Sequence, residues 1–363
     1  MSAPDRVRLV VLFGGQSAEH DVSCVSAFHV LRAADPSRYE VDAIGITKAG
    51  DWVRADEAIA ALQAGQEALG PVAGSVQAAG TAIEPLPAIT PAQTDDLPVV
   101  VLPILHGTRG EDGTVQGLLE LAGVPYVGTG VLGSALCMDK LKAKDVVAAH
   151  GLPQVPWLGL RASDAAAAGD RVAEAGLRYP LFVKPANLGS SVGVSKVPEP
   201  GALDAAVDLA ATYDEWIVIE EGADGREIEV AVLGNEHPRA SVPGEVRPAS
   251  DFYDYADKYL DGSAELVIPA PLADDVADEV RALACEAFTL LRCDGMARVD
   301  FFYEEHGRGL LLNEVNTIPG FTPISMYPKL WSATGLEYGA LIDELVRLAL
   351  ERHARRARFS VDR

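Results

Sequence analysis

The sequence predicts an α/β protein of two or three domains, the first built on a parallel sheet. Its 363 residues correspond to two or three units at about 150 residues per domain. Hydrophobic residues make up 48% of the chain, which is enough for several cores and excludes a disordered chain. Over the first ~130 residues, strand-like runs alternate with helix-like segments, a pattern typical of parallel sheets.

Three apolar runs are the expected strands of the first domain: residues 8–13, 39–46 and 99–105. The first and the third are nearly continuous in apolar residues, as expected for strands covered on both faces. Between the second and the third, residues 55–96 are rich in Ala, Gly, Pro and acidic residues. We expect a partly helical surface segment there.

The middle of the chain predicts further helices and strands. Residues 131–150 read as one helical stretch that ends at Gly151-Leu152-Pro153. Residues 181–183 are a short expected strand, and residues 216–220 and 227–233 are expected to pair with each other around a Gly-rich connection. Residues 249–263 are polar and aromatic without a clear period, and they are the candidate lid loop.

The C-terminal part begins with an amphipathic helix expected at residues 273–291. Residues 296–303 and 309–315 predict a strand pair, and residues 336–350 predict a closing helix. We interpret the basic residues between 352 and 358 as a solvated helix end, where cations suit the helix dipole.

The charge balance argues against two classes of partner. The chain has 30 basic and 53 acidic residues, a net charge of −23, and such a surface repels nucleic acid and anionic membranes. No stretch reaches the ~20 apolar residues of a membrane span, and residues 1–13 lack a signal-peptide cleavage site. The four cysteines are scattered without a C-x-x-C pair. We expect a cytoplasmic protein with reduced core thiols.

Several common motifs are absent from the sequence. There is no G-x-x-x-x-G-K-[ST], and Gly14-Gly15-Gln16-Ser17 does not have the spacing of G-x-G-x-x-G. G-x-S-x-G and H-E-x-x-H are also missing. A Walker-type P-loop is therefore excluded.

Oxygen-bearing side chains gather on the C-terminal strand pair. Glu314 and Asn316 are two residues apart on a strand and point to the same side, and a hairpin brings Asp300 opposite them. Such hard oxygen ligands suit Mg²⁺. The alternative is an ordinary exposed strand with acidic residues, but the following turn ends in Gly320, whose backbone N–H is open to a substrate.

Two further segments have the composition of ligand sites. Lys184 ends an apolar strand and precedes the loop PANLGSSVGV, which predicts an anion cradle, although a plain turn has the same composition. The stretches GGQSAE and HGTRGEDG follow the first and third strands, where parallel sheets bind ligands. Glu19 there suits a substrate ammonium; the alternative is helix capping by Ser17 and a favourable helix-dipole position for Glu19.

Taken in order, these segments resemble the D-alanine–D-alanine ligases of the ATP-grasp superfamily. The matching stretches are GGQSAEHDVS, HGTRGEDGTVQGLLELAGVPYVGTG, SALCMDKLKAK, FVKPANLGSSVGVSKV, FYDYADKYL, and ARVDFF with LLNEVNTIPGFTPISMYP. The resemblance runs from about residue 8 to 350 and is interrupted mainly at 55–96. It implies a three-domain ATP-grasp architecture divided at residues 1–130, 131–223 and 224–363, and a homodimer.

The resemblance also implies a nucleotide site with two Mg²⁺ (or Mn²⁺) ions. The residues implied for ATP are Lys140 and Lys184 at the phosphates, Glu220 and Glu227 at the adenine and ribose, the backbone near Gly222 and Ala223 at the adenine edge, and Lys258 at the γ-phosphate. The metal ligands implied are Asp300, Glu314 and Asn316.

For two D-alanine substrates, the resemblance implies a second set of residues. Glu19 would hold the ammonium of the first D-alanine and His106 would lie near its carboxylate. Arg298 and the Gly320 N–H would stabilise the oxyanion, and Ser325 would hold the second carboxylate. A triad of Glu19, Ser190 and Tyr259 would lock the lid, and a tyrosine at position 259 favours an amide over an ester product.

Two positions depart from the family pattern. Leu188 stands where a charged residue is common in the family. Glu221 directly follows Glu220, at a position where some members have a basic residue. Three alternatives remain open: an ATP-grasp ligase with another acceptor, a nucleotide-binding regulator without activity, and a dinucleotide-binding oxidoreductase. The intact set of Lys184, Arg298 and Asp300 counts against the regulator, and the missing glycine fingerprint counts against the oxidoreductase.

Overall fold

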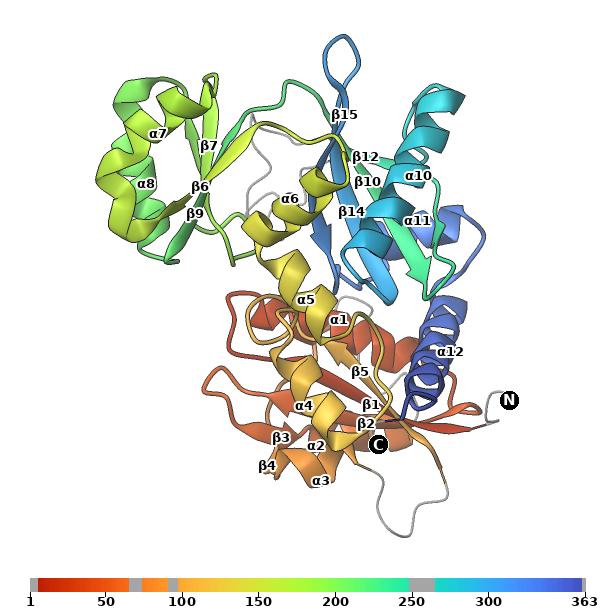
Figure 1. The fold of residues 1–363 in the computed structure, drawn as a ribbon. Coiled ribbons are helices and arrows are strands. Elements are labelled where there is room, and N and C mark those ends of the chain that lie inside the picture. Colours follow the sequence, from red (N-terminus) through yellow and green to blue (C-terminus); the bar gives the residue numbers. More distant parts are fainter. Residues whose placement is uncertain (1–5, 65–73, 91–96, 248–264, 361–363) are drawn as a thin grey trace.

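The computed structural model describes residues 6–64, 74–90, 97–247 and 265–360, whose strands form three sheets. Figure 1 shows the chain running from the N-terminal sheet through a smaller central sheet to a C-terminal sheet, with the last helix returning to the N-terminal part. No helix of the described residues is long and apolar enough to cross a membrane.

The N-terminal sheet has the strand order β4-β3-β2-β1-β5. Its strands are β1 (Val7–Gly14), β2 (Tyr39–Ile46), β3 (Trp52–Arg54), β4 (Thr81–Ala82) and β5 (Val99–Ile104). β1 is parallel to β2 and to β5, whereas β3 and β4 are antiparallel additions at one edge. The predicted parallel sheet is therefore confirmed.

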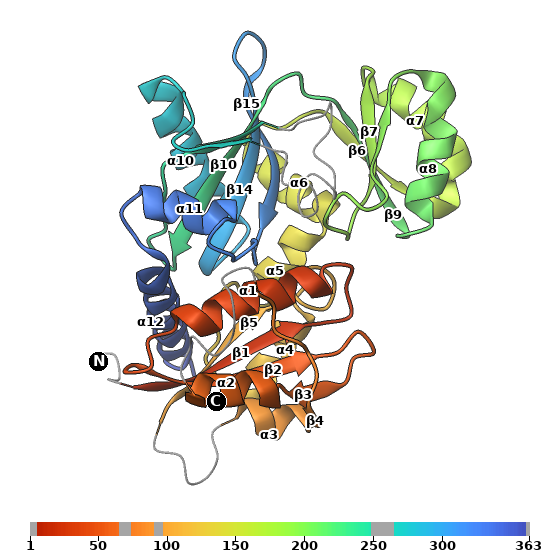
Figure 2. The same ribbon diagram turned by 180° about the vertical axis from the view of Figure 1, so that it is seen from behind.

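Alternate side chains of β1 enter two cores, as its continuous apolar sequence predicts. Leu9 and Val11 pack with α1 (His20–Ala33) and α12 (Tyr338–Arg356), and Figure 2 shows α1 lying across the sheet. Val10 and Leu12 pack on the other face with α3 (Pro85–Ile89) and α4 (Thr114–Ala122).

The segment from 55 to 96, expected to be a partly helical surface segment, also contributes to the core of the first domain. It contains α2 (Asp56–Ala64), the edge strand β4 and α3, and it buries Val76 and Ile89 against the sheet. Within it, residues 65–73 and 91–96 lie outside the described ranges. Its weak sequence periodicity hid this packing, because each short element buries only one or two residues, such as Ala58 and Ile59 of α2.

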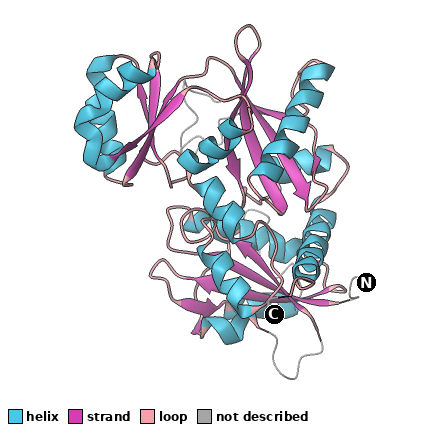
Figure 3. Cartoon of the chain, in the orientation of Figure 1, coloured by secondary structure: helices cyan, strands magenta, loops and turns pink. Residues whose placement is uncertain are grey.

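The central sheet is antiparallel in the order β6-β9-β7-β8. It consists of β6 (Trp157–Arg161), β7 (Leu181–Pro185), β8 (Ser195–Val197) and β9 (Trp216–Glu221), and it is covered by η2 (Ala162–Ala167), α7 (Ala168–Ala175), η3 (Pro200–Ala202) and α8 (Leu203–Ala211). Figure 3 shows these helices on the outer side of the sheet. The inner side is left to face the third sheet.

The C-terminal sheet is also antiparallel and has the order β13-β12-β10-β14-β15, with β11 paired to β10. Its strands are β10 (Arg226–Gly234), β11 (Arg239–Ala240), β12 (Gly244–Arg247), β13 (Glu265–Val267), β14 (Gly295–Glu304) and β15 (Gly309–Asn316). α10 (Asp274–Leu290) covers one face, and α11 (Met326–Ala333) packs on β10. The predicted pairing of β14 with β15 is confirmed.

One strand pairing predicted from the sequence is wrong. β9 pairs with β6 and β7 in the central sheet, whereas β10 pairs with β11, β12 and β14 in the C-terminal sheet. Residues 222–225 therefore cross between two sheets and do not form a hairpin. Gly225 makes the crossing possible, since a Cβ there would lie 2.6 Å from the carbonyl oxygen of Tyr303.

The helical stretch at 131–150 is two helices, α5 (Val131–Met138) and α6 (Lys140–Ala149). They meet at Asp139, whose backbone is extended and whose carboxylate accepts the N–H of Lys142 as the N-cap of α6. Cys137, Val147 and Leu152 add to the core of the C-terminal sheet. Much of this stretch, assigned to the central domain from sequence, thus packs on the C-terminal sheet.

The last helix is longer and less solvated than predicted. α12 continues to Arg356, and Arg352 is only 4% exposed. Its Nη1 donates to the carbonyl of Gly128, and its guanidinium lies 4.1 Å from the centre of the Tyr126 ring. Arg352 is therefore a buried contact with the N-terminal part of the chain, whereas His353, Arg356 and Arg358 at the same helix end are exposed, as predicted.

The hairpin of β14 and β15 contains a β-bulge. Asp300 pairs with Glu314, but the next pair is Phe301 with Leu312, so Asn313 is an extra residue. All four cysteines are free thiols, as expected. Cys137 and Cys293 nevertheless meet in the core, with their Sγ atoms 3.5 Å apart.

Candidate active site

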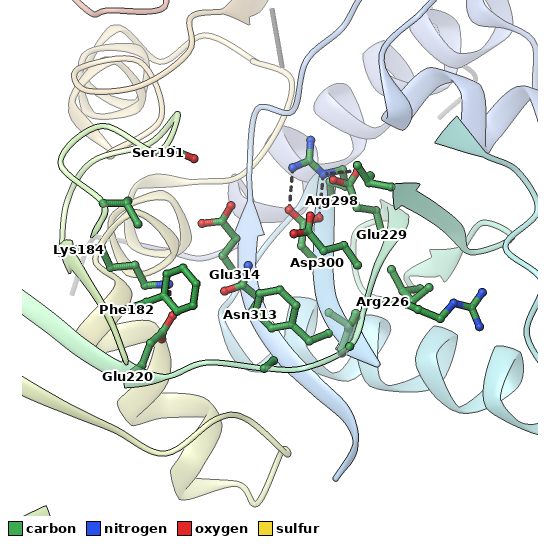
Figure 4. A pocket seen from close by; sticks show the side chains of 18 of the residues that line it. Phe182, Lys184, Ser191, Glu220, Arg226, Glu229, Arg298, Asp300, Asn313 and Glu314 are labelled. Carbon is green, nitrogen blue, oxygen red and sulfur yellow. Dashed lines mark hydrogen bonds and ion pairs between the residues drawn. The ribbon is translucent and has the colours of Figure 1, made fainter. Parts of the chain in front are cut away.

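A cavity of about 410 Å³ lies between the central and C-terminal sheets, within the usual range of small-molecule sites. Figure 4 shows that side chains from both sheets point into it. Its charged lining includes Lys140, Lys184, Glu220, Glu227, Glu229, Arg298, Asp300 and Glu314.

Strand alternation explains how charged side chains reach the cavity walls. In β7, Leu181 and Val183 enter the core under α7 and α8, so Phe182 and Lys184 face the cavity. In β10, Ile228 and Val230 enter the core under α10, which leaves Glu229 on the cavity side. Each sheet therefore presents an apolar face to its helices and a face that carries the charged residues to the other sheet.

A lysine cluster forms the central-sheet wall. Lys184 Nζ lies 2.5 Å from Glu220 Oε1, and Lys144 Nζ lies 2.9 Å from Glu220 Oε2. Burial by itself raises the pKa of Glu220, but the two lysine charges outweigh burial and lower this pKa to about 2. Glu220 is therefore ionised at neutral pH.

Lys140 approaches the same wall from the start of α6. Its Nζ donates to the carbonyl of Leu188 at 2.5 Å, and its backbone N–H donates to the carbonyl of Ala186. Burial lowers the pKa of Lys140, and the Glu314 carboxylate opposes the shift. In the same loop, Ser190 and Ser191 have φ angles of 52° and 57°, which is uncommon for residues other than glycine.

The opposite wall carries acidic side chains in a row across three strands. Glu229 pairs with Asp300, which pairs with Glu314. Like charges directly opposite each other are destabilising, and a cation compensates them here. Arg298 donates to both oxygens of Asp300 at 2.8 and 2.7 Å, and its Nε lies 3.0 Å from Glu229 Oε2. Asn316 Nδ2 also donates to Asp300 at 2.8 Å.

A third group of residues joins the N-terminal sheet to this cavity. Ser190 Oγ donates to Glu19 Oε1 at 2.5 Å, although the two residues are 171 positions apart. Gly107 lies against the same carboxylate, because a Cβ there would be 2.7 Å from Glu19 Oε2. The ends of β1 and β5 and the loop after β7 therefore meet at Glu19, as the parallel topology predicts for the first two.

His106 lies beside Glu19 in a defined protonation state. Its Nδ1 is 2.9 Å from the carbonyl oxygen of Ile318, and an oxygen that only accepts requires Nδ1 to carry the proton. Nε2 then accepts from Ser26 Oγ at 3.3 Å. Burial lowers the pKa of His106, against the opposing charge of Glu19, so the ring is neutral.

The turn after β15 completes the arrangement. Ile318, at its start, holds His106, and Gly320 lies against Ser325, since a Cβ on Gly320 would be 3.1 Å from Ser325 Oγ. Ser325 Oγ accepts the N–H of Thr322 at 3.1 Å and contacts its hydroxyl at 2.8 Å. The turn is thereby fixed next to the end of β5.

Family models match the greater part of the chain. Residues 8–129 match the model described as D-ala D-ala ligase N-terminus, and residues 146–347 match D-ala D-ala ligase C-terminus.

This chain belongs to the D-alanine–D-alanine ligase family.

Individual relatives agree with this membership. The chain is similar to D-alanine–D-alanine ligases of Thermoanaerobacter sp. (47% identity, covering 98% of this chain and 99% of the relative) and of Nocardia farcinica (48%, covering 96% and 98%). Among solved structures, it is similar to the D-alanine-D-alanine ligase of Coxiella burnetii (TM-score 0.79, 35% identity, covering 98% and 97%) and to the VanG D-Ala:D-Ser ligase of Enterococcus faecalis (TM-score 0.78, 32%, covering 95% and 99%).

In this member of the ligase family, most residues implied by the resemblance lie in two neighbouring groups. Lining the cavity are Lys140, Lys184, Ser190, Glu220, Ala223, Glu227, Arg298, Asp300 and Glu314. Glu19 and Asn316 lie next to lining residues, and His106 lies next to Glu19. Gly320 and Ser325 lie together in the turn whose Ile318 contacts His106. Lys258 and Tyr259 lie outside the described residues, as does the candidate lid at 249–263.

Gly222 is placed differently from its neighbour Ala223. It is not among the residues that line the cavity. Its N–H donates to the carbonyl of Pro180 at 2.8 Å, and its own carbonyl accepts from Arg308 at 2.8 Å. Both backbone groups of Gly222 are therefore engaged by protein, which favours Ala223 for a contact with a base.

The implied metal ligands have the composition that a hard cation requires. Asp300 and Glu314 are cross-strand partners, and the Asn316 side chain touches Asp300, so three oxygen-bearing side chains converge. Among the described residues, no group of three His, Cys, Asp or Glu side chains is placed to hold a metal ion. The amide of Asn316 would thus have to complete the set.

Sequence reasoning assigned no role to several residues that the structure brings to this region. Glu111 lies within the HGTRGEDG stretch, and its carboxylate accepts the Gly107 N–H at 2.8 Å. Lys144 and Glu229 pair with Glu220 and Arg298, and Arg308 holds Gly222. Glu111 and Lys144 stand inside matching stretches, which was the available signal; Glu229 and Arg308 depend on cross-strand neighbours that a sequence does not show.

Proposed function

We propose that this chain is an ATP-dependent ligase that joins two D-alanine molecules into D-alanyl-D-alanine and releases ADP and phosphate, for peptidoglycan precursor synthesis. Membership of the ligase family along the whole chain carries the proposal. The cavity supports it with a lysine cluster on one wall and an arginine between carboxylates on the other. Phosphoryl transfer depends on cations that neutralise phosphate charge, which lysines supply directly and carboxylates would supply by holding a metal ion.

In the proposed reaction, a carboxylate oxygen of the first D-alanine attacks the γ-phosphorus of ATP. The bond from that phosphorus to the bridging oxygen breaks, and ADP leaves. Lys140 and Lys184 bind the phosphates, and Ala223 and Glu227 face the base and ribose. Glu19, held by Ser190, binds the ammonium of the first substrate.

The amine of the second D-alanine then attacks the acyl carbon. Phosphate leaves with its electron pair and takes up the proton that the amine loses. Arg298 and the N–H of Gly320 stabilise the oxyanion of this step. Ser325 binds the second carboxylate, and neutral His106 lies near the first, where it adds no charge of its own.

Two Mg²⁺ (or Mn²⁺) ions bound by Asp300, Glu314 and Asn316 would neutralise charge on the phosphates. A triad of Glu19, Ser190 and Tyr259 would close the lid, together with Lys258 at the γ-phosphate. Closure would exclude water, which otherwise hydrolyses the acyl-phosphate.

We further propose functional units at residues 1–130, 131–223 and 224–363, a homodimer and a cytoplasmic location. The N-terminal unit supplies Glu19 and His106, the central unit supplies the lysine cluster, and the C-terminal unit supplies the metal ligands. The packing of α5 and α6 on the C-terminal sheet gives residues 131–152 a connecting role between the last two.

The deciding experiment measures phosphate release from ATP and Mg²⁺ with D-alanine, L-alanine, D-alanine plus D-lactate, or D-alanine plus D-serine, with products identified by mass. D-serine is included because of the likeness to a D-Ala:D-Ser ligase. We expect D-alanine to drive turnover and the D-alanyl-D-alanine dipeptide to form. Arg298→Met should lower kcat by about 10²–10³-fold. Absence of D-alanine-dependent turnover, or a mixed product formed in preference, would refute the proposed substrate.

A further inference from the structure

Lys144 is a buried cation to which the proposed reaction gives no task. It lies on α6, four residues after Lys140, so the two lysines project from the same side of the helix. Only 3% of Lys144 is exposed, and it is not among the residues that line the cavity. A buried ammonium is costly unless a partner compensates for its lost hydration, so the partner indicates the role.

That partner is Glu220, which does line the cavity. Lys144 Nζ lies 2.9 Å from one carboxylate oxygen, and Lys184 Nζ lies 2.5 Å from the other. All three side chains are at most 10% exposed. One carboxylate is therefore shared between two ammonium groups, and the three side chains carry a net charge of +1 (two cations, one anion).

The charge state of the cluster follows from its surroundings. With a pKa near 2, Glu220 is ionised throughout the neutral range and compensates one positive charge. Burial lowers the pKa of Lys144, and the Glu220 carboxylate opposes this. If Lys144 were absent, Glu220 and Lys184 would form a neutral pair at the cavity wall.

We infer that Lys144 is a positioning residue that takes up part of the Glu220 charge and so leaves Lys184 a net cation toward nucleotide phosphates. The inference rests on the proposed ATP-dependent reaction. It concerns affinity for phosphate groups and not for the base, because the loss of one net charge acts on anions alone. The role thus differs from packing, which would act on every nucleotide alike.

The test compares adenosine, ADP and ATP as ligands of the full-length protein by isothermal titration, with Mg²⁺ present and D-alanine omitted. For Lys144→Met, we expect the Kd for ATP to rise about tenfold or more, the Kd for ADP to rise less, and the Kd for adenosine to change by less than about threefold. Lys142→Met is the matched control on the same helix: Lys142 is exposed and pairs with Asp145, and its three affinities should equal those of wild type. Equal losses for adenosine and ATP, or no loss for ATP, would overturn the inference.

A double variant separates charge sharing from a simple loss of one cation. In Lys144→Met with Glu220→Gln, both charges are gone and Lys184 is again a net cation. We expect the ratio of ATP affinity to adenosine affinity to return to within about threefold of wild type. A ratio as low as that of the single variant would contradict the inference. Should Lys144→Met not fold, the double variant and Lys144→Arg, which keeps the charge and should keep the ratio, provide the same comparison with wild type.

The wild-type phosphate-release assay distinguishes failure of this inference from failure of the proposed function. If wild type shows D-alanine-dependent turnover while Lys144→Met keeps its ratio of ATP to adenosine affinity, the inference alone is wrong. If wild type shows no such turnover, the proposed function is wrong, whatever the variants bind.

Discussion

Glu111 is a carboxylic acid whose ionisation opposes folding. Burial, together with the nearby charge of Glu19, raises its pKa to about 8. In an unfolded chain this pKa lies near 4.5, so the folded state holds the proton more tightly. The stabilisation is complete below about pH 4.5 and is lost as the pH rises through 8.

The Glu111→Gln variant should therefore lose part of the pH dependence of stability. We expect the Tm of wild type to fall more between pH 5.5 and 8.5 than that of Glu111→Gln, because the amide has no proton to release. Thermal unfolding at three pH values measures this, with Glu174→Gln, an exposed position on α7, as the control. Parallel pH profiles for wild type and Glu111→Gln would show that Glu111 does not titrate in this range.

Position in sequence predicted the residues whose role follows from backbone topology. Glu19 and His106 were expected at the carboxyl ends of parallel strands, and they meet there. Asp300 and Glu314 were expected opposite each other and are cross-strand partners. The protonation of His106 was not predictable, because it depends on the carbonyl of Ile318, 212 residues away.

At the scale of elements, the hinge between β9 and β10 (residues 222–225) is fixed by hydrogen bonds from the turn of the β14–β15 hairpin. Arg308 donates to Glu304, to Glu221 and to the carbonyl of Gly222. The backbone N–H and the guanidinium of Arg178 add three hydrogen bonds to Glu221 from the segment before β7. The acidic Glu221, a departure from some family members, is thus compensated by two arginines from different parts of the chain.

Removing Arg308 should loosen this hinge and weaken ATP binding. For Arg308→Met we expect KM for ATP to rise about three- to tenfold, since hydrogen bonds from a charged group to the hinge are lost. KM for D-alanine should stay within about twofold. Initial rates measure both, with Arg347→Met, an exposed α12 residue paired with Glu344 and Glu351, as the control. An unchanged KM for ATP would limit Arg308 to a stabilising role.

The same hinge shows why one element pairing was mispredicted. Two apolar runs flanking a glycine-rich connection have the pattern of a hairpin. Nothing in the local amino-acid sequence distinguishes a chain that turns back into a hairpin from one that crosses to another sheet. The distinction depends on distant partners: Gly222 bonds Pro180, and Gly225 lies against Tyr303.

At the scale of the whole molecule, α12 connects the two ends of the chain. Leu341, Ile342 and Leu345 pack into the same core as β1 and α1, and Figure 1 shows α12 beside the N-terminal sheet. Arg352 donates to Glu120 and to the Gly128 carbonyl at the end of this helix. Composition and length predicted several domains. They did not predict that the last helix packs on the N-terminal core, because an amphipathic pattern does not reveal which surface will cover the apolar face of a helix.

Because Arg352 is buried, we expect it to contribute more to stability than Arg356, four residues later on α12. We expect Arg352→Met to lower the free energy of unfolding by about 2–4 kcal/mol, because a buried charge pair and a bond to a carbonyl are lost. Arg356→Met is the matched control: Arg356 also pairs with Glu120 but is 54% exposed, and its loss should cost under about 1 kcal/mol. Urea unfolding followed by fluorescence compares the two. Equal effects would show that burial of Arg352 contributes little.

The bulge at Asn313 changes which residues of β15, the even-numbered or the odd-numbered ones, face the core. Before it, the even-numbered Leu310 and Leu312 enter the core under α10; after it, the odd-numbered Val315 does. The adjacent residues Asn313 and Glu314 both line the cavity as a result. Counting by twos from the leucines would bury Glu314, so a motif search based on strict alternation would discard it. Glu314 stays opposite Asp300 because its position is set by the strand register and not by its spacing from the leucines. A one-residue gap at position 313 in an aligned relative would therefore leave that pair intact.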